Sequence, residues 1–331
     1  MLENQLSRYG SISRAIPDLA PSSKLFLVSD SDDTTVGPLN LGNEFPVDRD
    51  GVARVYTTIQ AANNAAAAGR GDVIVVLPGY DQTLGRADSW NTAGVQIVGY
   101  GNGNNRPTIR YTAKTDEVGI GANNVRVSNL RFLAATDSIA RAVDIDSGFS
   151  GIKIEKSLWD FDSAGDDFRV MLRVGSPRSR IEENRFIARD SGPASGRAIS
   201  LKGGAPSHTV ISRNYIYGQY DTVGDTSDGA GAIVQDTTDT ADTNLSGLII
   251  NDNLIINTDT AAAMFMRLDG GGYRVTGIAS DNRLAAYDSS SADTAKVITG
   301  IAVAEGVRFL GNLLSSDSSQ EHRVGDTTVV A

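Results

Sequence analysis

The sequence predicts an all-β fold, a right-handed parallel β-helix, and three observations lead to this prediction. A loose motif recurs about every 30 residues through most of the 331-residue chain. The composition, with 35 glycines against 9 prolines and many Ser, Thr, Asn and Asp residues, suits short strands joined by turns. Only one segment has the pattern of a helix. A chain of this length forms about two ordinary domains or one large all-β domain.

The first 50 residues differ from the rest of the chain. They show no sustained periodicity and contain four of the nine prolines. Within them, Leu25–Val28 is apolar enough to form a short strand. We interpret residues 1–50 as an extended N-terminal arm that lies on the protein's own body or on a partner, with a partly disordered terminus as the alternative. Residues 51–331 then form the β-helix domain.

A single short helix is predicted near residues 57–68, at the start of this domain. Thr57 or Thr58 can cap it, its alanine-rich run favours helix, and a glycine follows at Gly69. Residues 73–77 come next and have the pattern of a buried strand. A short helix that precedes a strand-rich region is suited to cap the first coil of a solenoid.

The repeat consists of an apolar run, an Asn or Ser marker, and a second apolar run. The markers are Asn129, Ser157, Asn184, Asn214, Asn253, Asn282 and Asn312. They are separated by 28, 27, 30, 39, 29 and 30 residues, and the longest step carries an insertion within 221–230 or 236–244. A further strand-like run lies between successive markers. This period, without a helix in each repeat, is typical of strands that stack into a solenoid.

The marker residues suit sharp corners between strands. Asn tolerates the left-handed conformation, and stacked Asn side chains can bond from one coil to the next. Leucine-rich repeats are the rival fold, but they have a shorter period and need a leucine framework that this chain lacks. In the β-helix, we expect Ile250, Phe265 and Leu313 to point into the core.

Two adjacent segments also resemble a known family. Residues 58–66 (TIQAANNAA) and 71–80 (GDVIVVLPGY) look like the N-terminal cap and first coil of pectin-lyase-like β-helix proteins. With the coils that follow, the resemblance covers roughly residues 52–331. It implies the fold and not the activity, because this fold carries lyases, hydrolases and viral spikes or decorations alike. Residues 8–46 are similar to leaders of structural proteins of tailed bacteriophages.

The motifs of the polygalacturonase-like hydrolases of this fold are not matched. Those enzymes use Asn-Thr-Asp, Asp-Asp, Gly-His-Gly and Arg-Ile-Lys in that order. Here Asp166-Asp167 precedes the Asn-Thr-Asp at 257–259, and Arg-Ile-Lys is absent. Neither His208 nor His322 is flanked by glycine. Glycoside hydrolysis needs paired carboxylates, but a solvated turn is the simpler interpretation of Asp166 and Asp167.

Pectate-lyase chemistry needs a calcium cluster and an arginine base. Asp166, Asp167 and Arg169 lie close together in sequence, and more arginines follow within about one coil, interleaved with Glu182 and Glu183. A solvated face of mixed charge explains this pattern. The sequence therefore predicts no catalytic, cofactor-binding or metal-ligating residue, and no cofactor.

Charge and composition limit the other classes. The formal net charge of −10 repels phosphate backbones, so no nucleic-acid partner is expected. No apolar run approaches eighteen residues and no secretory signal pattern opens the chain, so no membrane partner is expected. There are no cysteines, and two histidines 114 residues apart disfavour a zinc site. Residues 30–41 lack the calcium-loop glycine, and residues 99–104 break the dinucleotide fingerprint.

One aromatic pair is prominent. Tyr215 and Tyr217 flank Ile216, so the two tyrosines should share the outer face of a strand. Such a pair can stack a sugar or anchor a protein interface, and the low aromatic content of 6% favours the interface.

These observations favour a noncatalytic virion structural protein, a capsid decoration or cement protein whose arm docks on the major capsid protein or another virion protein. The alternative is a tailspike-like polysaccharide depolymerase, either a glycoside hydrolase or a lyase, and a bacterial surface adhesin is a weaker third. Residues 327–331 are strand-like to the last residue, so the final coil needs a partner at its edge. The resemblance to β-helix virion proteins makes a homotrimer the expected state.

Overall fold

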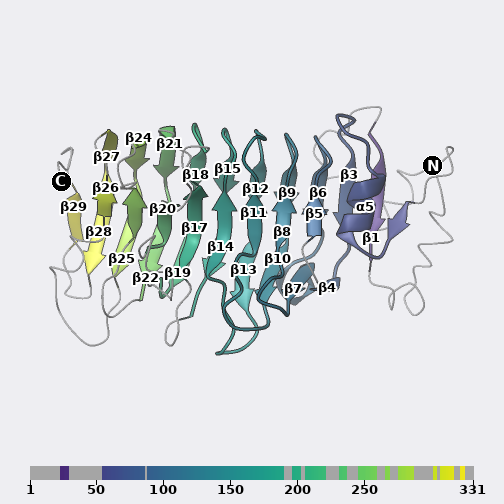
Figure 1. Cartoon of the computed structure of the whole chain (residues 1–331). Coiled ribbons are helices and arrows are strands. Elements are labelled where there is room, and N and C mark those ends of the chain that lie inside the picture. The colour runs from purple at the N-terminus through teal and green to yellow at the C-terminus, as the bar shows by residue number, and fades with distance from the viewer. Residues whose placement is uncertain are drawn as a thin grey trace.

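The computed structural model describes the chain over the following residues: 23–29, 54–85, 88–189, 196–202, 206–220, 231–236, 245–258, 265–268, 275–286, 301–303, 306–316 and 321–324. Within them, the strands form three long sheets, and apart from β1, β2 and β29 the neighbouring strands lie three apart along the chain. The chain passes from sheet 1 to sheet 2 to sheet 3 in each coil, and Figure 1 shows the coils stacked in order from the N-terminal to the C-terminal end.

The bounds of the elements follow for each sheet. Sheet 1 has the order β2 (Val55–Tyr56), β1 (Leu25–Val28), β3 (Val73–Val76), β6 (Gln96–Gly99), β9 (Arg126–Ser128), β12 (Lys153–Glu155), β15 (Arg180–Glu182), β18 (Val210–Ser212), β21 (Leu245–Asn251), β24 (Val275–Ser280), β27 (Val307–Leu310). Sheet 2 has the order β29 (Glu321–Val324), β28 (Asn312–Ser316), β25 (Arg283–Ala286), β22 (Leu254–Asn257), β19 (Tyr215–Gly218), β16 (Arg185–Ile187), β13 (Leu158–Phe161), β10 (Arg131–Ala134), β7 (Thr108–Tyr111), β4 (Asp81–Leu84). Sheet 3 has the order β26 (Ile301–Val303), β23 (Met266–Leu268), β20 (Ile233–Asp236), β17 (Arg197–Lys202), β14 (Val170–Val174), β11 (Val143–Ile145), β8 (Val118–Ile120), β5 (Asp88–Trp90).

The strands pair in parallel throughout, except that β29 pairs antiparallel with β28. The predicted fold is confirmed: the chain is a right-handed parallel β-helix with coils of about 29 residues. The antiparallel β29 covers the edge of β28, the last parallel strand of sheet 2, and the edge that the sequence analysis expected to need a partner stays a prediction. Residues 327–331 lie outside the described residues.

The predicted helix is present as α5 (Ile59–Ala65). Thr58 caps it, since its Oγ1 accepts a hydrogen bond from the amide of Ala61 at 3.1 Å. The helix ends before residue 68 because the next amide, that of Ala67, donates to the buried carboxylate of Asp72 at 2.8 Å. A 3-10 turn, η2 (Gly103–Asn105), is the other described helical element. No helix among the described residues is long and apolar enough to cross a membrane.

The predicted strand at Leu25–Val28 is β1, which pairs in parallel with β3 and is buried. This strand lies within residues 1–50 and is nevertheless part of sheet 1. Apart from residues 23–29, the predicted arm lies outside the described residues, and docking through it stays a prediction.

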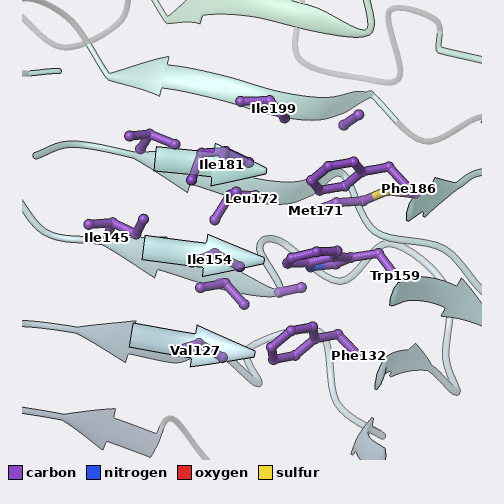
Figure 2. Close-up of a cluster of buried hydrophobic side chains, with 14 of the residues drawn as sticks. Val127, Phe132, Ile145, Ile154, Trp159, Met171, Leu172, Ile181, Phe186 and Ile199 are labelled. Atoms are coloured by element: carbon purple, nitrogen blue, oxygen red, sulfur yellow. The ribbon is translucent and has the colours of Figure 1, made fainter. Parts of the chain in front are cut away.

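The core is filled by inward side chains that stack from coil to coil (Figure 2). Phe132, Trp159 and Phe186 form one such column, with ring centroids 4.7 and 4.5 Å apart. The predicted core residues Ile250 and Phe265 are buried. The prediction for Leu313 was wrong, since this residue is half-buried and pairs with Arg283. Arg283 is exposed whereas the next residue, Leu284, is buried, so this pair belongs to the outward column.

The corner between sheets 1 and 2 holds a ladder of asparagines. The side-chain oxygens of Asn184, Asn214, Asn253, Asn282 and Asn312 each accept a hydrogen bond from the backbone amide of the equivalent residue one coil earlier, at 2.9–3.0 Å. The ladder side chains also donate back to carbonyls of earlier coils. All five asparagines are buried. The predicted bonding from coil to coil is therefore confirmed.

The predicted conformation of these asparagines is wrong for all but one marker. The left-handed residue is the one just before each ladder position, as at Glu183, Arg213 and Asp252, with φ between 55° and 58°. Asn129 is the exception, because it is itself left-handed and Leu130 follows at the ladder position. The buried position needs an amide to bond backbone groups, whereas the outward position needs only a side chain that tolerates positive φ.

Candidate functional site

Because the ladder residue points inward, the left-handed residue before it points to solvent at the same corner. This outer column consists of Asn129, Lys156, Glu183, Arg213, Asp252, Asp281 and Gly311. Asp252 and Asp281 stand at equivalent positions in consecutive coils, since Asn251 pairs with Ser280 in the strands that precede them. The fold thus aligns two exposed carboxylates that are 29 residues apart in sequence.

These two carboxylates line an open groove of about 570 Å³ on the corner. Arg283 and Leu313 line it from sheet 2, together with Leu254. Asp252 accepts a hydrogen bond from Asn251 Nδ2 at 2.6 Å. For Asp281 and for the guanidinium of Arg283, no hydrogen bond or ion pair forms with any side chain among the described residues.

The groove is open at Asp281 because the next coil has glycine at the equivalent position. Gly311 adopts φ of +63°, and a Cβ built on it would lie 2.7 Å from Asp281 Oδ1. A side chain at 311 would therefore meet the carboxylate of Asp281. The sequence analysis missed this site, although the Asp that directly precedes two of the asparagine markers was a usable signal.

Tyr215 and Tyr217 lie beside the groove on the outer face of sheet 2, as predicted. Ile216 between them is buried, and Tyr215 pairs with Leu254 of the groove. The two rings are parallel within 3° and their centroids are 6.3 Å apart. The guanidinium carbon of Arg185 lies 5.5 Å from the centroid of the Tyr215 ring. Aromatic faces and cations thus continue from the groove along the outer face of sheet 2.

Asp166 and Asp167 do not form a site. Asp166 accepts hydrogen bonds from the amide and hydroxyl of Ser163, as expected for a turn. Asp167 was expected in a solvated turn and is instead buried, where it accepts a hydrogen bond from the amide of Ser138. Burial raises the pKa of Asp167, and the guanidinium of Arg189 lies 3.6 Å away. These contacts indicate that Asp167 stabilises the fold.

The other sequence candidates are also dispersed. Asn257 and Thr258 are buried, and Asp259 lies outside the described residues. His208 occupies a left-handed turn between sheets 3 and 1, and His322 lies in β29. No group of three His, Asp or Glu side chains suited to a metal ion occurs in the part of the chain that the structure describes.

Some of the arginines that follow Asp166 are paired with acids. Arg173 bonds Asp144 at 2.9 Å through Nε, and Arg180 bonds Glu182 at 2.6 Å. Each carboxylate is shared with a further cation: Asp144 also lies near Arg141, and Glu182 also pairs with Lys153. The interpretation of this region as a face of mixed charge is supported.

Among known proteins, only solved structures are similar to this chain. No family model matches the chain, and no curated protein matches it. It is similar to two mutants of the tailspike protein of E. coli bacteriophage HK620 in complex with a pentasaccharide, with TM-scores of 0.43 and 0.41, identities of 13% and 16%, and 82% and 84% of this chain covered. The match spans 62% and 63% of those tailspike chains, less than two thirds of their length.

A further similar structure is the endo-xylogalacturonan hydrolase from Aspergillus tubingensis, with a TM-score of 0.38, 11% identity, 89% of this chain and 94% of that chain. The fold of the present chain follows from its own strand pairing: three parallel sheets, one strand of each per coil, and an internal asparagine ladder. The chain is a right-handed parallel β-helix.

Proposed function

We propose that the protein binds a polysaccharide along the outer face of sheet 2 and hydrolyses it in the corner groove. The observation that carries this proposal is the alignment of Asp252 and Asp281 in one open groove, with Arg283 beside them. This is the alternative function of the sequence analysis. It takes precedence over the noncatalytic function because Asp252 and Asp281, which the sequence analysis did not single out, lie at equivalent positions of consecutive coils in one groove.

The spacing of the coils suits a retaining mechanism. Neighbouring parallel strands lie about 4.8 Å apart, and retaining glycosidases hold their two carboxyl groups about 5–5.5 Å apart. Asp252, which accepts a hydrogen bond from Asn251, attacks the anomeric carbon. Asp281 gives its proton to the glycosidic oxygen, and the leaving sugar departs as an alcohol. Water then releases the bound sugar from Asp252 and returns a proton to Asp281.

The tyrosine pair supplies binding energy outside the groove. Tyr215 and Tyr217 are half-buried and present parallel rings on the same face as the groove. Aromatic rings offer large contact area to the apolar face of a sugar at little entropic cost. A glycan that crosses the strands of sheet 2 contacts the tyrosines and reaches Asp252 and Asp281 in one extended conformation.

A second candidate is the noncatalytic decoration protein of the sequence analysis, and one observation favours it. The outward column of sheet 1 contains an apolar stripe, Val210, Ile249 and Ile278, that precedes Arg308, and the two isoleucines are 40% and 41% exposed. Exposed apolar stripes of this kind serve protein contacts. Location on a virion, docking through the arm and a homotrimeric state belong to the proposal in either form.

The test is hydrolysis of a panel of capsular and other bacterial surface polysaccharides, measured by the release of reducing ends. We expect Asp252→Asn and Asp281→Asn each to lower the rate at least 100-fold, with unchanged circular dichroism. Asp166→Asn is the matched control and should leave the rate within twofold. A panel from which the native protein releases no reducing ends, or a rate that survives in both variants, would overturn hydrolysis and leave the decoration role.

A further inference from the structure

The outer face of sheet 2 carries a second cluster of cations, away from the groove. Arg131 and Arg185 stand in the same outward column, two coils apart, with Leu158 between them. Arg106 lies just before β7, whose first residue Thr108 pairs with Arg131. From Arg185 to Arg283 this column spans three strand spacings, about 14 Å along the axis.

The charges of this cluster are not balanced by acids. Arg131 donates from Nη2 to Asp160 at 2.8 Å, and that is the one carboxylate paired with the three arginines among the described residues. The Nε atoms of Arg106 and Arg131 are buried and have no hydrogen-bond partner there. Burial, and then the charges of Arg185 and Arg131, lower the pKa of Arg106. Buried donors without partners are rare in folded proteins.

An aromatic face adjoins these cations. Arg185 lies over the ring of Tyr215. The ring of Tyr217 is parallel to that of Tyr215, and both lie on the outer face of sheet 2. Guanidinium groups bind carboxylates through two parallel hydrogen bonds, and an aromatic ring binds the apolar face of a sugar. A ligand that satisfies both groups carries a carboxylate on a pyranose ring.

We propose that Arg106, Arg131, Arg185 and Tyr215 form a binding site for a short acidic stretch of the glycan, on the coils that precede the groove. The site deepens the proposed function, on which it rests, by assigning the glycan to the carboxylate-bearing class. The carboxylates of that stretch bind the accessible parts of the three guanidinium groups, and a sugar ring lies against the tyrosine pair. The net charge of −10 makes a local basic site selective, since the rest of the protein repels an acidic chain.

The experiment measures binding by calorimetry in the Asp252→Asn/Asp281→Asn background, so that no cleavage occurs. The probes are oligomers of galacturonate, mannuronate and sialate, each paired with the same oligomer reduced at its carboxyl groups. We expect at least one acidic oligomer to bind at least 10-fold tighter than its reduced form. Arg185→Ala and Arg106→Ala should each abolish most of this difference. Arg308→Ala, an exposed arginine of sheet 1, is the matched control and should bind within twofold of the parent.

Three outcomes would overturn the site: no acidic oligomer binds better than its reduced form, the preference survives in Arg185→Ala, or inorganic sulfate binds as tightly as the best oligomer. The last result would identify a simple anion site without a sugar. The preference for acid is measured without hydrolysis, so the two proposals fail separately. Cleavage of a glycan without any binding preference for acid would leave the groove and refute this site, whereas acidic binding without cleavage would do the reverse.

Discussion

The corner between sheets 1 and 2 places two contrasting columns one residue apart. The inner column is nearly uniform, with asparagine at five consecutive coils, and each side chain bonds the backbone of neighbouring coils. The outer column, from Lys156 to Gly311, holds either sign of charge and ends in glycine, although all members share the left-handed conformation. The inner residues are chosen by the fold, because a buried backbone amide needs a partner. The outer residues meet a weaker structural demand and are available for function.

The outer column also has an energetic cost. A residue with a Cβ in the left-handed conformation is less favourable than glycine by about 1 kcal/mol, with Asp and Asn penalised least. Glycine would therefore suit every outer position. At Asp252 and Asp281 the chain instead keeps carboxylates over an open groove. Side chains retained where glycine would be more stable are a mark of functional sites.

The inner column should give the largest effect on stability. Asn253 donates to Ile211 O and to Asn282 Oδ1, and its own oxygen accepts from Asn214. Asn253→Ala leaves these buried groups without partners, and we expect the free energy of unfolding to fall by about 3 kcal/mol. Urea unfolding followed by circular dichroism measures this change.

A surface asparagine provides the control for that experiment. Asn104 is exposed in the η2 turn, and Asn104→Ala should change the free energy of unfolding by less than about 0.5 kcal/mol. If Asn253→Ala proved equally mild, the ladder would be a consequence of the stacking and not one of its causes.

Glu182, two positions before the ladder, tests an intermediate case. It is buried, and burial alone would raise its pKa, but hydrogen bonds from Arg180 and Lys153 prevail and hold the pKa below 4.5. A lowered pKa stabilises the fold at pH values above the pKa of the unfolded chain, and this stability is lost as pH falls through the folded pKa. Glu182→Gln should therefore lower the free energy of unfolding by about 1–2 kcal/mol at pH 7, because Arg180 and Lys153 are partly exposed.

The difference between Glu182→Gln and the native protein should shrink as the pH is lowered below about 4. Urea titrations at pH 7, 5 and 3 measure it. Its exposed neighbour Glu183 is the matched control, and Glu183→Gln should change stability by less than about 0.5 kcal/mol at every pH. A Glu182→Gln effect that is independent of pH would show that the pairs with Arg180 and Lys153 contribute nothing.

The sequence predicted the repeat and fold well because both depend on local patterns. The coil length, the helix capped by Thr58 and the burial of Ile250 follow from apolar period, turn residues and capping chemistry. The exact position of the corner was missed by one residue, since a motif of apolar residues around Asn does not say which residue turns. The outward residues just before the markers were therefore not identified as candidate site residues.

The site could not be predicted in the same way, because it depends on stacking. Asp252 and Asp281 are unremarkable in sequence, and only the pairing of β21 with β24 brings them to equivalent positions. The opposite happened at Asp166 and Asp167, where adjacency in sequence suggested a shared environment. Asp167 turns inward to the amide of Ser138, whereas Asp166 stays in the turn with Ser163.

The smallest expected change in stability comes from glycine substitutions in the outer column, and it distinguishes the outer column from the inner one most clearly. Asp252→Gly and Asp281→Gly remove a Cβ from the left-handed conformation, at the cost of a more flexible unfolded chain. We expect a net gain of about 0.5 kcal/mol in the free energy of unfolding, together with loss of hydrolysis. Lys156→Gly, at the same column position outside the groove, should gain as much and keep full activity. Urea unfolding and reducing-end assays on the same three variants measure both effects. If glycine at 252 or 281 lowered the free energy of unfolding by more than about 1 kcal/mol, the carboxylate would have a structural role at the corner. The inference that these side chains are retained for function would then fail.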